Sequence, residues 1–428
     1  MADIQAGRLS ATELAENFAD VCQPLDRAAA MAEANRCYFC YDAPCINACP
    51  TGIDIPGFIR AIATSNVAGA ALSILRENIF GGSCARVCPT EILCQGACVR
   101  HDPPVAIGLL QRHATEHLNT DAPHPFSRAP VTGRKVAVLG AGPAGLSCAH
   151  GLARQGHQVV VFEARDKPGG LNEFGIAAYK LPDDFAQREA AFILAVGGIE
   201  IRYSQQVMLS QLRQDFDAVF LGMGQGGIRL LNLPGEDLLG VQNAVNYIAE
   251  LRQAANLSSL PMGARVVVIG GGNTAIDIAV QSKRLGAEDV TIVYRRGPEK
   301  MSATRHEQAF AQINGVRIKH WLQPVRFEGE ADKVVAAVFT AGQTDNETVI
   351  PCDMVFKAVG QTYLPMADDG LELADGRIAV EKNGRTSLPD VWAGGDCVAG
   401  EDLTVQAVQD GKLAARAIDA FLQENRGS

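Results

Sequence analysis

Eight of the twelve cysteines in this chain of 428 residues lie between Cys37 and Cys98. Four occur in "RCYFCYDAPCINACP" (residues 36–50), and four more occur in "CARVCPTEILCQGACVR" (residues 84–100). Thiols at this density could form disulfides, bind zinc or hold iron–sulfur clusters. Structural disulfides are rare in a reducing compartment, and zinc has no redox chemistry. The choice depends on the chemistry that the rest of the chain supports.

A glycine-rich turn follows a predicted strand in "KVAVLGAGPAGL" (residues 135–146). Gly140 permits the tight turn, Gly142 lets a pyrophosphate approach the backbone, and Gly145 allows close packing of helix on strand. The helix N-terminus favours the pyrophosphate, and Glu163 ends the next predicted strand, where a carboxylate accepts hydrogen bonds from a ribose. The residues predicted to bind this first dinucleotide are Gly140, Gly142, Pro143, Ala144, Gly145 and Glu163.

The pattern recurs in "RVVVIGGGNTAIDIAVQSKRLGAEDVTIVYRR" (residues 265–296), but its second strand ends in two arginines instead of an acid. Guanidinium groups pair bidentately with phosphate, so these arginines favour the ribose 2′-phosphate of NADPH. Two alternatives remain: the arginines form only a solvated face, or the site also takes NADH. The residues predicted to bind this nucleotide are Gly270, Gly271, Gly272, Asn273, Thr274, Ala275, Arg295 and Arg296.

Two such sites in one chain resemble the flavoprotein oxidoreductases with two dinucleotide-binding domains. The stretch "VWAGGDCVAG" (residues 391–400) is similar to the second FAD motif of that superfamily. The resemblance implies that the first site holds FAD and the second NAD(P)H. It also implies that Asp396 bonds the ribityl chain and that the helix starting near Thr404 faces the pyrimidine end of the flavin. The further FAD residues implied are Gly170, Leu171, Gly395, Asp396, Thr404 and Val405.

These patterns predict an α/β fold with two Rossmann-like dinucleotide-binding domains, preceded by an all-α iron–sulfur domain. We expect the helical domain at residues 1–125 and the NAD(P)H domain at 251–354. The FAD domain is expected to be discontinuous, at 126–250 and 355–428.

A flavin next to clustered thiols favours two 4Fe–4S clusters, because a flavin takes a hydride and iron–sulfur clusters carry single electrons. In the bacterial two-cluster run, three close cysteines share a cluster and the cysteine before proline joins the other. Cluster one is therefore assigned to Cys37, Cys40, Cys45 and Cys98, and cluster two to Cys49, Cys88 and Cys94. Cys84 is the candidate fourth ligand of cluster two on chemistry alone, because thiolate is the usual ligand.

The two cysteine stretches and "IGLLQRHATEH" (residues 107–117) resemble the iron–sulfur domain of dihydropyrimidine dehydrogenase, and to a lesser degree the small subunit of glutamate synthase. The first resemblance implies an unusual glutamine ligand to cluster two at Gln111, which leaves Cys84 spare. Glutamate synthase small subunits tend to carry glutamate there. Lys180 is the candidate catalytic residue near the flavin. It departs from the pyrimidine enzyme, which has an arginine there, and the alternative is a surface charge without a role.

The resemblance covers only the N-terminal half of the eukaryotic enzyme, without its FMN barrel. It implies an electron-input subunit of a heteromeric bacterial enzyme of pyrimidine catabolism, which passes electrons from NAD(P)H through FAD and two clusters to an FMN- and iron–sulfur-containing partner that reduces uracil or thymine. The alternatives are a glutamate synthase small subunit, a related NADPH-dependent flavoprotein, or a non-catalytic metal-binding assembly module.

Composition bears on partners and location. The net charge of −10 disfavours nucleic acid and anionic membranes as partners. No apolar run reaches the length of a membrane span, and the polar N-terminus has no signal-peptide core. We therefore expect a cytoplasmic protein.

Overall fold

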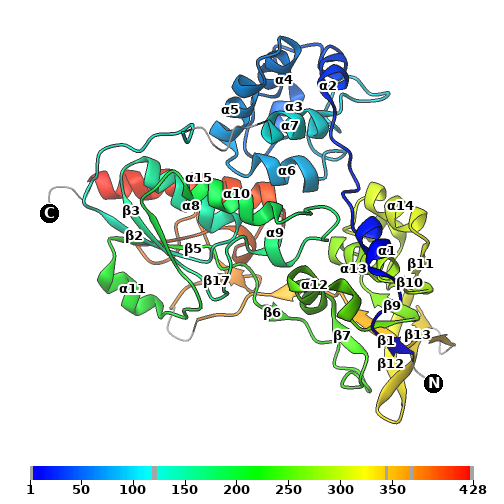
Figure 1. The fold of residues 1–428 in the computed structure, drawn as a ribbon. Coiled ribbons are helices and arrows are strands. Elements are labelled where there is room, and N and C mark those ends of the chain that lie inside the picture. Colours follow the sequence, from blue (N-terminus) through cyan, green and yellow to red (C-terminus); the bar gives the residue numbers. More distant parts are fainter. Residues whose placement is uncertain (1–2, 118–122, 343–345, 367–369, 425–428) are drawn as a thin grey trace. The chain divides into compact units, whose positions relative to one another are not determined.

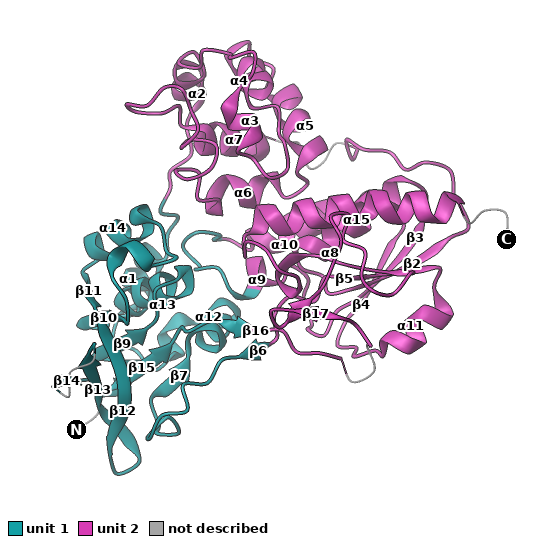
Figure 2. Cartoon of the chain, turned by 180° about the vertical axis from the view of Figure 1, so that it is seen from behind, with its two compact units in different colours: residues 1–21, 174–182, 227–361 teal, residues 22–173, 183–226, 362–428 magenta. Residues whose placement is uncertain are grey.

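The computed structural model describes residues 3–117, 123–342, 346–366 and 370–424. The chain forms two compact units (Figure 2). The first unit comprises residues 1–21, 174–182 and 227–361, and the second comprises 22–173, 183–226 and 362–428.

The second unit begins with a helical domain that carries both cysteine stretches (Figure 1). Side chains cap three of its helices: Asp26, Asp54 and Asn66 each accept a backbone N–H from the first turn. Phe58 and Ile74 are completely buried in its core. In chain order the helices are α2 (Arg27–Ala34), α3 (Pro44–Asn47), α4 (Ile55–Ala63), α5 (Val67–Glu77), α6 (Gly81–Val87) and α7 (Ile107–Glu116).

The same unit contains a parallel five-stranded sheet in the order β19-β5-β2-β3-β4. The inner strands β2 and β3 are rich in valine, as expected for parallel strands that are covered on both faces. Two helices, α8 (Pro143–Arg154) and α15 (Thr404–Glu424), pack closely together beside this sheet (Figure 1). The strands are β2 (Lys135–Leu139), β3 (Gln158–Phe162), β4 (Ile199–Arg202), β5 (Ala218–Leu221) and β19 (Val391–Ala393).

Shorter elements complete this part of the chain. Phe174, at the end of α9, is the first residue of the segment 174–182 that belongs to the first unit. The remaining elements are α9 (Leu171–Phe174), α10 (Phe185–Leu194), α11 (Leu209–Asp215), β17 (Leu373–Ala374), β18 (Arg377–Ile378) and the 3₁₀ helix η3 (Gly395–Cys397).

The first unit has its own parallel sheet in the order β11-β10-β9-β15-β7, and a separate antiparallel sheet, β12-β13-β14. Its N-terminal strand β1 (Ile4–Gln5) pairs with β8 (Met262–Gly263). The sheet strands are β7 (Val241–Asn243), β9 (Arg265–Ile269), β10 (Asp289–Tyr294), β11 (Val316–His320), β12 (Leu322–Glu330), β13 (Lys333–Ala341), β14 (Glu347–Pro351) and β15 (Met354–Lys357). The helices and remaining short elements are α1 (Ala11–Asn17), α12 (Ala244–Gln253), α13 (Asn273–Arg284), α14 (Arg305–Ile313), η1 (Leu257–Ser259), η2 (Pro298–Lys300), β6 (Gly227–Ile228) and β16 (Gln361–Thr362).

Each parallel sheet carries one of the two predicted glycine-rich turns, directly after β2 and β9. The sheet of the first unit also includes β7, which precedes the predicted domain limit at residue 251. The three domain ranges proposed from the sequence stay a prediction. Within the described part of the chain, no helix is both long and apolar enough to cross a membrane. The cytoplasmic location likewise stays a prediction.

Candidate cofactor sites

The turn between β2 and α8 is built from backbone alone. Gly140 has φ of +91°, and a Cβ there would lie 2.5 Å from the carbonyl oxygen of Gly222. A Cβ on Gly145 would lie 1.9 Å from the oxygen of Gly140, so only glycine fits at either position. Gly142, by contrast, has only the Cα of Gly170 nearby, at 3.7 Å. The open backbone at the N-terminus of α8 fits a pyrophosphate, as the predicted FAD site requires.

Glu163 fixes this turn from the end of β3. Its carboxylate accepts the N–H of Ala141 at 2.7 Å and the N–H of Arg165 at 2.9 Å. The side chain is buried. A carboxylate has about four lone-pair sites, so this one can still accept bonds from a ribose.

The second predicted FAD motif lies at η3. Gly395 has φ of +74° and donates its N–H to Oδ2 of Asp410 at 2.9 Å. Burial raises the pKa of the neighbouring Asp396 to about 6, with a further contribution from Asp402. Asp396 is half-buried, and a carboxyl group in such a position can accept hydrogen bonds from ribityl hydroxyls.

The start of α15 is tied to the stretch around the other predicted FAD residues. The hydroxyl of Thr404 donates to Oδ1 of Asn172 at 3.0 Å, while Val405 is buried. Leu171, next to Asn172, keeps 39% of its surface exposed. The sequence did not predict roles for Asn172 and Asp410. Asn172 lies 232 residues from its partner Thr404, and no local pattern connects the two residues.

The second glycine-rich turn has the same construction in the first unit. A Cβ on Gly270 would lie 2.2 Å from the oxygen of Ala358. Gly272 faces only the hydroxyl of Ser302, 3.2 Å from an added Cβ. Asn273 and Thr274 begin α13, and Ala275 is buried. A Cβ on Gly271 would lie 2.5 Å from the ring of Tyr294.

Arg295 and Arg296 follow β10 directly, and both are exposed. Among the described residues, neither guanidinium makes a hydrogen bond or ion pair. This is the strand end at which a Rossmann fold meets the nucleotide ribose. Free guanidinium groups there fit a 2′-phosphate, and NADPH at this site stays a prediction.

Four thiols line a single pocket in the helical domain. These are the four thiols assigned to cluster one. Ile55 and Ile107 line the same pocket and form part of its apolar wall. Burial raises the pKa of the Cys45 thiol to about 11, and the neighbouring thiols of Cys37 and Cys98 add to the shift. The members of this set are Cys37, Cys40, Cys45 and Cys98.

The thiols assigned to cluster two also neighbour one another. A hydrogen bond with Cys84, followed by burial and the nearby thiols of Cys94 and Cys49, raises the pKa of Cys88. Burial, with a contribution from Cys49, raises the pKa of Cys94 to about 12. Metal binding deprotonates such thiols. In the described residues no three ligating side chains are arranged to hold a single metal ion. A four-iron cluster has a different requirement, because each of its four irons takes one protein ligand.

Gln111, the predicted fourth ligand of cluster two with Cys84 as the alternative, is buried on α7. Its amide nitrogen donates to the carbonyl oxygen of Gly81 at 2.7 Å. That bond fixes the nitrogen and leaves the amide oxygen as the atom able to meet a metal. A glutamate could not make this bond when ionised, because it has no donor. The choice between Gln111 and Cys84 stays open.

Lys180 has partners within the first unit that the sequence did not reveal. Its ammonium lies 2.8 Å from Oδ1 of Asp277 and 2.8 Å from Oε1 of Glu307. Burial alone would lower the pKa of Lys180, but the two carboxylates more than offset it, so the pKa is raised. A catalytic role of Lys180 beside the flavin stays a prediction. The structure shows its ion pairs with Asp277 and Glu307.

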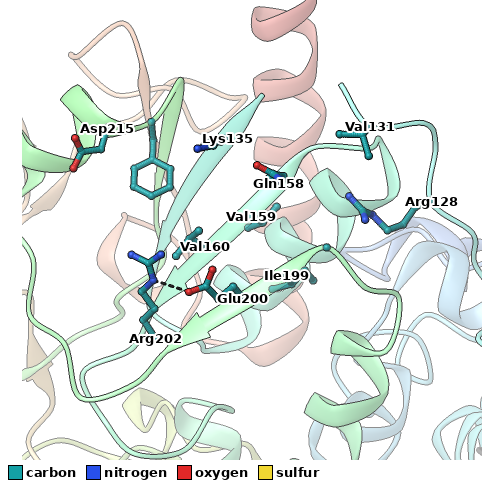
Figure 3. Close-up of a pocket in the computed structure, with 12 residues that line it drawn as sticks. Arg128, Val131, Lys135, Gln158, Val159, Val160, Ile199, Glu200, Arg202 and Asp215 are labelled. Carbon is teal, nitrogen blue, oxygen red and sulfur yellow. Dashed lines mark hydrogen bonds and ion pairs between the residues drawn. The ribbon is translucent and has the colours of Figure 1, made fainter. Parts of the chain in front are cut away.

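A pocket also lies on the sheet of the second unit, near the N-terminal ends of β2, β3 and β4 (Figure 3). None of its lining residues is predicted to bind a cofactor. They include Arg202, whose guanidinium is paired with Glu200 at 2.8 Å. Parallel sheets bind ligands at the carboxyl ends of their strands, so this pocket is not assigned to a cofactor.

Comparison with known families identifies both halves of the chain. Residues 134–411 match the model of pyridine nucleotide-disulphide oxidoreductases. The chain belongs to the pyridine nucleotide-disulphide oxidoreductase family. Residues 14–122 of this oxidoreductase match the model described as dihydropyrimidine dehydrogenase domain II, 4Fe-4S cluster. The predicted fold class, oxidoreductase class and cofactors (FAD, 4Fe–4S clusters and NADPH) are confirmed at the family level.

Relatives of two kinds match nearly the whole oxidoreductase. The NAD-dependent dihydropyrimidine dehydrogenase subunit PreT of Escherichia coli O157:H7 is 37% identical over 92% of this chain and 94% of its own. The glutamate synthase [NADPH] small chain of Halomonas elongata is 35% identical over 95% of this chain and 94% of its own. The predicted relationship to both kinds of subunit is confirmed.

Solved structures support the fold. FprA from Mycobacterium tuberculosis in complex with NADPH is similar with a TM-score of 0.57 at 20% identity, over 69% of this chain and 85% of that chain. Thioredoxin reductase of T. acidophilum has a TM-score of 0.53 at 21% identity, over 68% of this chain and 99% of that chain. At these identities the likeness shows the fold alone and not the substrate.

Proposed function

We propose that the chain is the electron-input subunit of a dihydropyrimidine dehydrogenase. In this role it takes electrons from NADPH and delivers them to a separate FMN-containing subunit that reduces uracil or thymine to the 5,6-dihydro form. The observation that carries the proposal is the combination of a dihydropyrimidine dehydrogenase-type iron–sulfur domain with two nucleotide turns in one chain. The similarity to PreT over 92% of the chain supports it.

The chain's own residues bind and orient the cofactors. The Gly140 turn and Glu163 hold the dinucleotide of FAD, and the Gly270 turn holds the pyrophosphate of NADPH. Bound FAD accepts a hydride and releases electrons singly, and 4Fe–4S clusters carry one electron each. Hydride transfer depends on orientation more than on an acid or base, so no proton-transferring residue is assigned.

The nucleotide preference is argued from Arg295 and Arg296. The PreT relatives are named NAD-dependent, while the glutamate synthase relatives are named for NADPH. In this chain two exposed guanidinium groups without partners among the described residues stand at the ribose end of β10. We therefore propose NADPH as the preferred donor, because a bare ribose gives two cations nothing to pair with.

The second candidate function is that of a glutamate synthase small subunit, supported by the relative from Halomonas elongata. Gln111 distinguishes the two functions. The bond from its amide nitrogen to Gly81 requires an amide, which favours the pyrimidine enzyme over a subunit with glutamate at this position.

The function is tested by reconstitution. The purified chain with NADPH should reduce a one-electron dye and leave uracil unchanged. Addition of an FMN-containing dihydropyrimidine dehydrogenase catalytic subunit should produce dihydrouracil, measured by chromatography. Uracil reduction by the chain alone would contradict the proposal. Production of glutamate with a glutamine-hydrolysing synthase subunit, and none of dihydrouracil, would assign the chain to the second function.

A further inference from the structure

Helix α15 presents neighbouring residues to both sides of the predicted FAD site. Successive helical residues point about 100° apart, so Asp410 and Gly411 face different structures. Asp410 accepts the N–H of Gly395 in the second FAD motif. Gly411 lies against α8, where an added Cβ would be 2.2 Å from the oxygen of Ala144. The middle of α15 is therefore fixed to both parts of the chain that hold FAD.

The next residue, Lys412, points toward the helical domain. Its ammonium donates to the carbonyl oxygen of Thr51 at 2.7 Å and to that of Glu77 at 3.0 Å, and it pairs with the Glu77 carboxylate at 2.9 Å. Glu77 ends α5, where carbonyl groups lack helical partners and a cation is favoured. The Lys412 side chain is 16% exposed and the Glu77 side chain 39%. Solvent therefore reaches the carboxylate of the pair, while the ammonium is held mainly by the two carbonyl groups.

Thr51 connects Lys412 to the iron–sulfur ligands. It lies two residues after Cys49, and its hydroxyl oxygen is 3.3 Å from the sulfur of Cys49. Its side chain is 2% exposed. Cys49 is a predicted ligand of cluster two. Hydrogen bonds to ligating sulfur and nearby positive charge both raise the potential of a cluster. One ammonium group therefore links the flavin helix to the loop that carries a cluster ligand.

We propose that Lys412 is a positioning residue for electron transfer between the flavin site and cluster two. Its bonds hold the Cys49 loop at a fixed distance from α15, and its charge makes cluster two a better electron acceptor. In the step concerned, reduced flavin loses one electron and cluster two gains it; no bond forms or breaks. The proposal rests on the proposed function, since it needs both cofactors in the same chain. The fixed distance matters because electron tunnelling slows steeply with separation.

The test compares variants of the anaerobically prepared holoprotein. Lys412→Met removes the charge and the donor, Lys412→Gln keeps a donor without charge, and Lys412→Arg keeps the charge. Arg416→Met is the matched control, because Arg416 is an exposed cation on the same helix. Stopped-flow absorbance follows flavin reduction by NADPH and then cluster reduction. Titration with dithionite, monitored by electron paramagnetic resonance, gives the potential of cluster two.

We expect flavin reduction to be unchanged in every variant. In Lys412→Met and Lys412→Gln the electron-transfer equilibrium from flavin to cluster two should weaken tenfold, which is a fall of about 59 mV in cluster potential for one electron. Lys412→Arg and Arg416→Met should keep the wild-type potential.

An unchanged potential in an iron-replete Lys412→Gln protein would overturn the proposal, even if Lys412→Met fails to fold. An equal fall in Arg416→Met would also overturn it, because it would show a general effect of charge. If NADPH reduces neither flavin nor clusters in the wild type, the proposed function fails, while the dithionite titration still decides the role of Lys412.

Discussion

At the scale of single residues, the unresolved choice is the fourth ligand of cluster two. Cys84 is 2% exposed and packs among the apolar residues of the second unit. Gln111 has an amide nitrogen fixed by Gly81, and its amide oxygen accepts no hydrogen bond from the residues that the structure describes. We expect Cys84→Ala to keep both clusters and Gln111→Ala to lose or alter one, measured by iron content and electron paramagnetic resonance. Gln111→Glu is the informative control, because it tests a carboxylate in the same place. A Cys84→Ala protein with a single cluster would assign the ligand to Cys84.

The two arginines after β10 give a second prediction at this scale. Replacing Arg295 and Arg296 with alanine should weaken NADPH binding and leave NADH binding nearly unchanged. Each lost charged hydrogen bond should cost about 1.5–3 kcal/mol. Titration of both nucleotides against flavin reduction provides the measurement. Arg317→Ala serves as the control, because Arg317 is exposed on the neighbouring strand β11. Equal affinity of the wild type for NADPH and NADH would show that the pair is only a solvated face.

At the scale of elements, the buried side chain of Glu189 caps α6, the helix that contains Cys84 and has Cys88 as its C-cap. Glu189 on α10 accepts the N–H and the hydroxyl of Ser83. Burial raises the pKa of Glu189 to about 7 from 4.5, although the bonds from Ser83 and the charge of Arg86 act in the opposite direction. Between about pH 4.5 and pH 7 the folded protein therefore keeps a proton on Glu189 that the unfolded chain has already released.

The sign of the pH dependence follows from that shift. The contribution of protonated Glu189 to stability is fully present below pH 4.5 and is lost as pH rises through about 7. The loss amounts to about 3 kcal/mol. Glu189→Gln should remove this pH dependence, because glutamine does not titrate. The variant should therefore gain stability relative to the wild type between pH 5.5 and 8, by at most roughly 1.4 kcal/mol for each pH unit. Unfolding midpoints of the anaerobic protein measure this, with exposed Glu401→Gln as control. Parallel pH profiles for wild type and Glu189→Gln would refute it.

Another element-scale feature is the segment 174–182, which is bonded to α13 within the first unit. Ala178 donates its N–H to Gln281 at 3.1 Å, the Tyr179 ring lies 4.2 Å from the guanidinium carbon of Arg284, and Lys180 pairs with Asp277. Because α13 begins at the Gly270 turn, the segment braces the helix that is predicted to bind the NADPH pyrophosphate.

Replacing Lys180 should lower the stability of the folded protein. Lys180→Met leaves two carboxylates, Asp277 and Glu307, without their cation, and breaking such a buried pair costs about 3–5 kcal/mol. The loss should be smaller at pH 5 than at pH 8, because a carboxylate can then take up a proton. Denaturation at both pH values measures it. Lys180→Arg should recover most of the stability, and exposed Lys319→Met should lose little. A neutral effect of Lys180→Met at pH 8 would contradict the buried-pair interpretation.

The elements show what the sequence could predict. Both glycine-rich turns were predictable because the steric demands at Gly140 and Gly270 arise from neighbouring backbone and leave a local pattern. The grouping of Cys37, Cys40 and Cys45 was predictable for the same reason of short spacing. The bond from Lys180 to Glu307, 127 residues away, and the bond from Lys412 to Thr51, 361 residues away, follow from tertiary packing. The antiparallel sheet β12-β13-β14 was also not predicted, since its strands do not follow the alternation of strand and helix.

At the scale of the whole molecule, the iron–sulfur domain and the predicted FAD domain share one apolar core in the second unit. Phe80 and Cys84 of the helical domain belong to the same buried cluster as Val138 and Leu146 of the FAD turn. Metal binding and folding are thermodynamically coupled where ligands lie in such a core. The same buried cluster contains the predicted FAD residues Ala144 and Val405, and Cys88 packs against it. Loss of the iron–sulfur clusters should therefore weaken the flavin site.

This coupling is measurable on the intact protein. Anaerobic preparations should contain FAD and about eight irons per chain, as two four-iron clusters require. Removing the iron with a chelator and an oxidant should lower the temperature at which FAD fluorescence is released, because the shared core loses the cross-links between α6, α7 and the cysteine loops. The control is the wild type treated with chelator alone, which should keep its iron and its release temperature. Iron near four per chain, or zinc in its place, would contradict the two-cluster assignment. Release of FAD at an unchanged temperature after complete iron removal would show instead that the two domains are stable independently of each other.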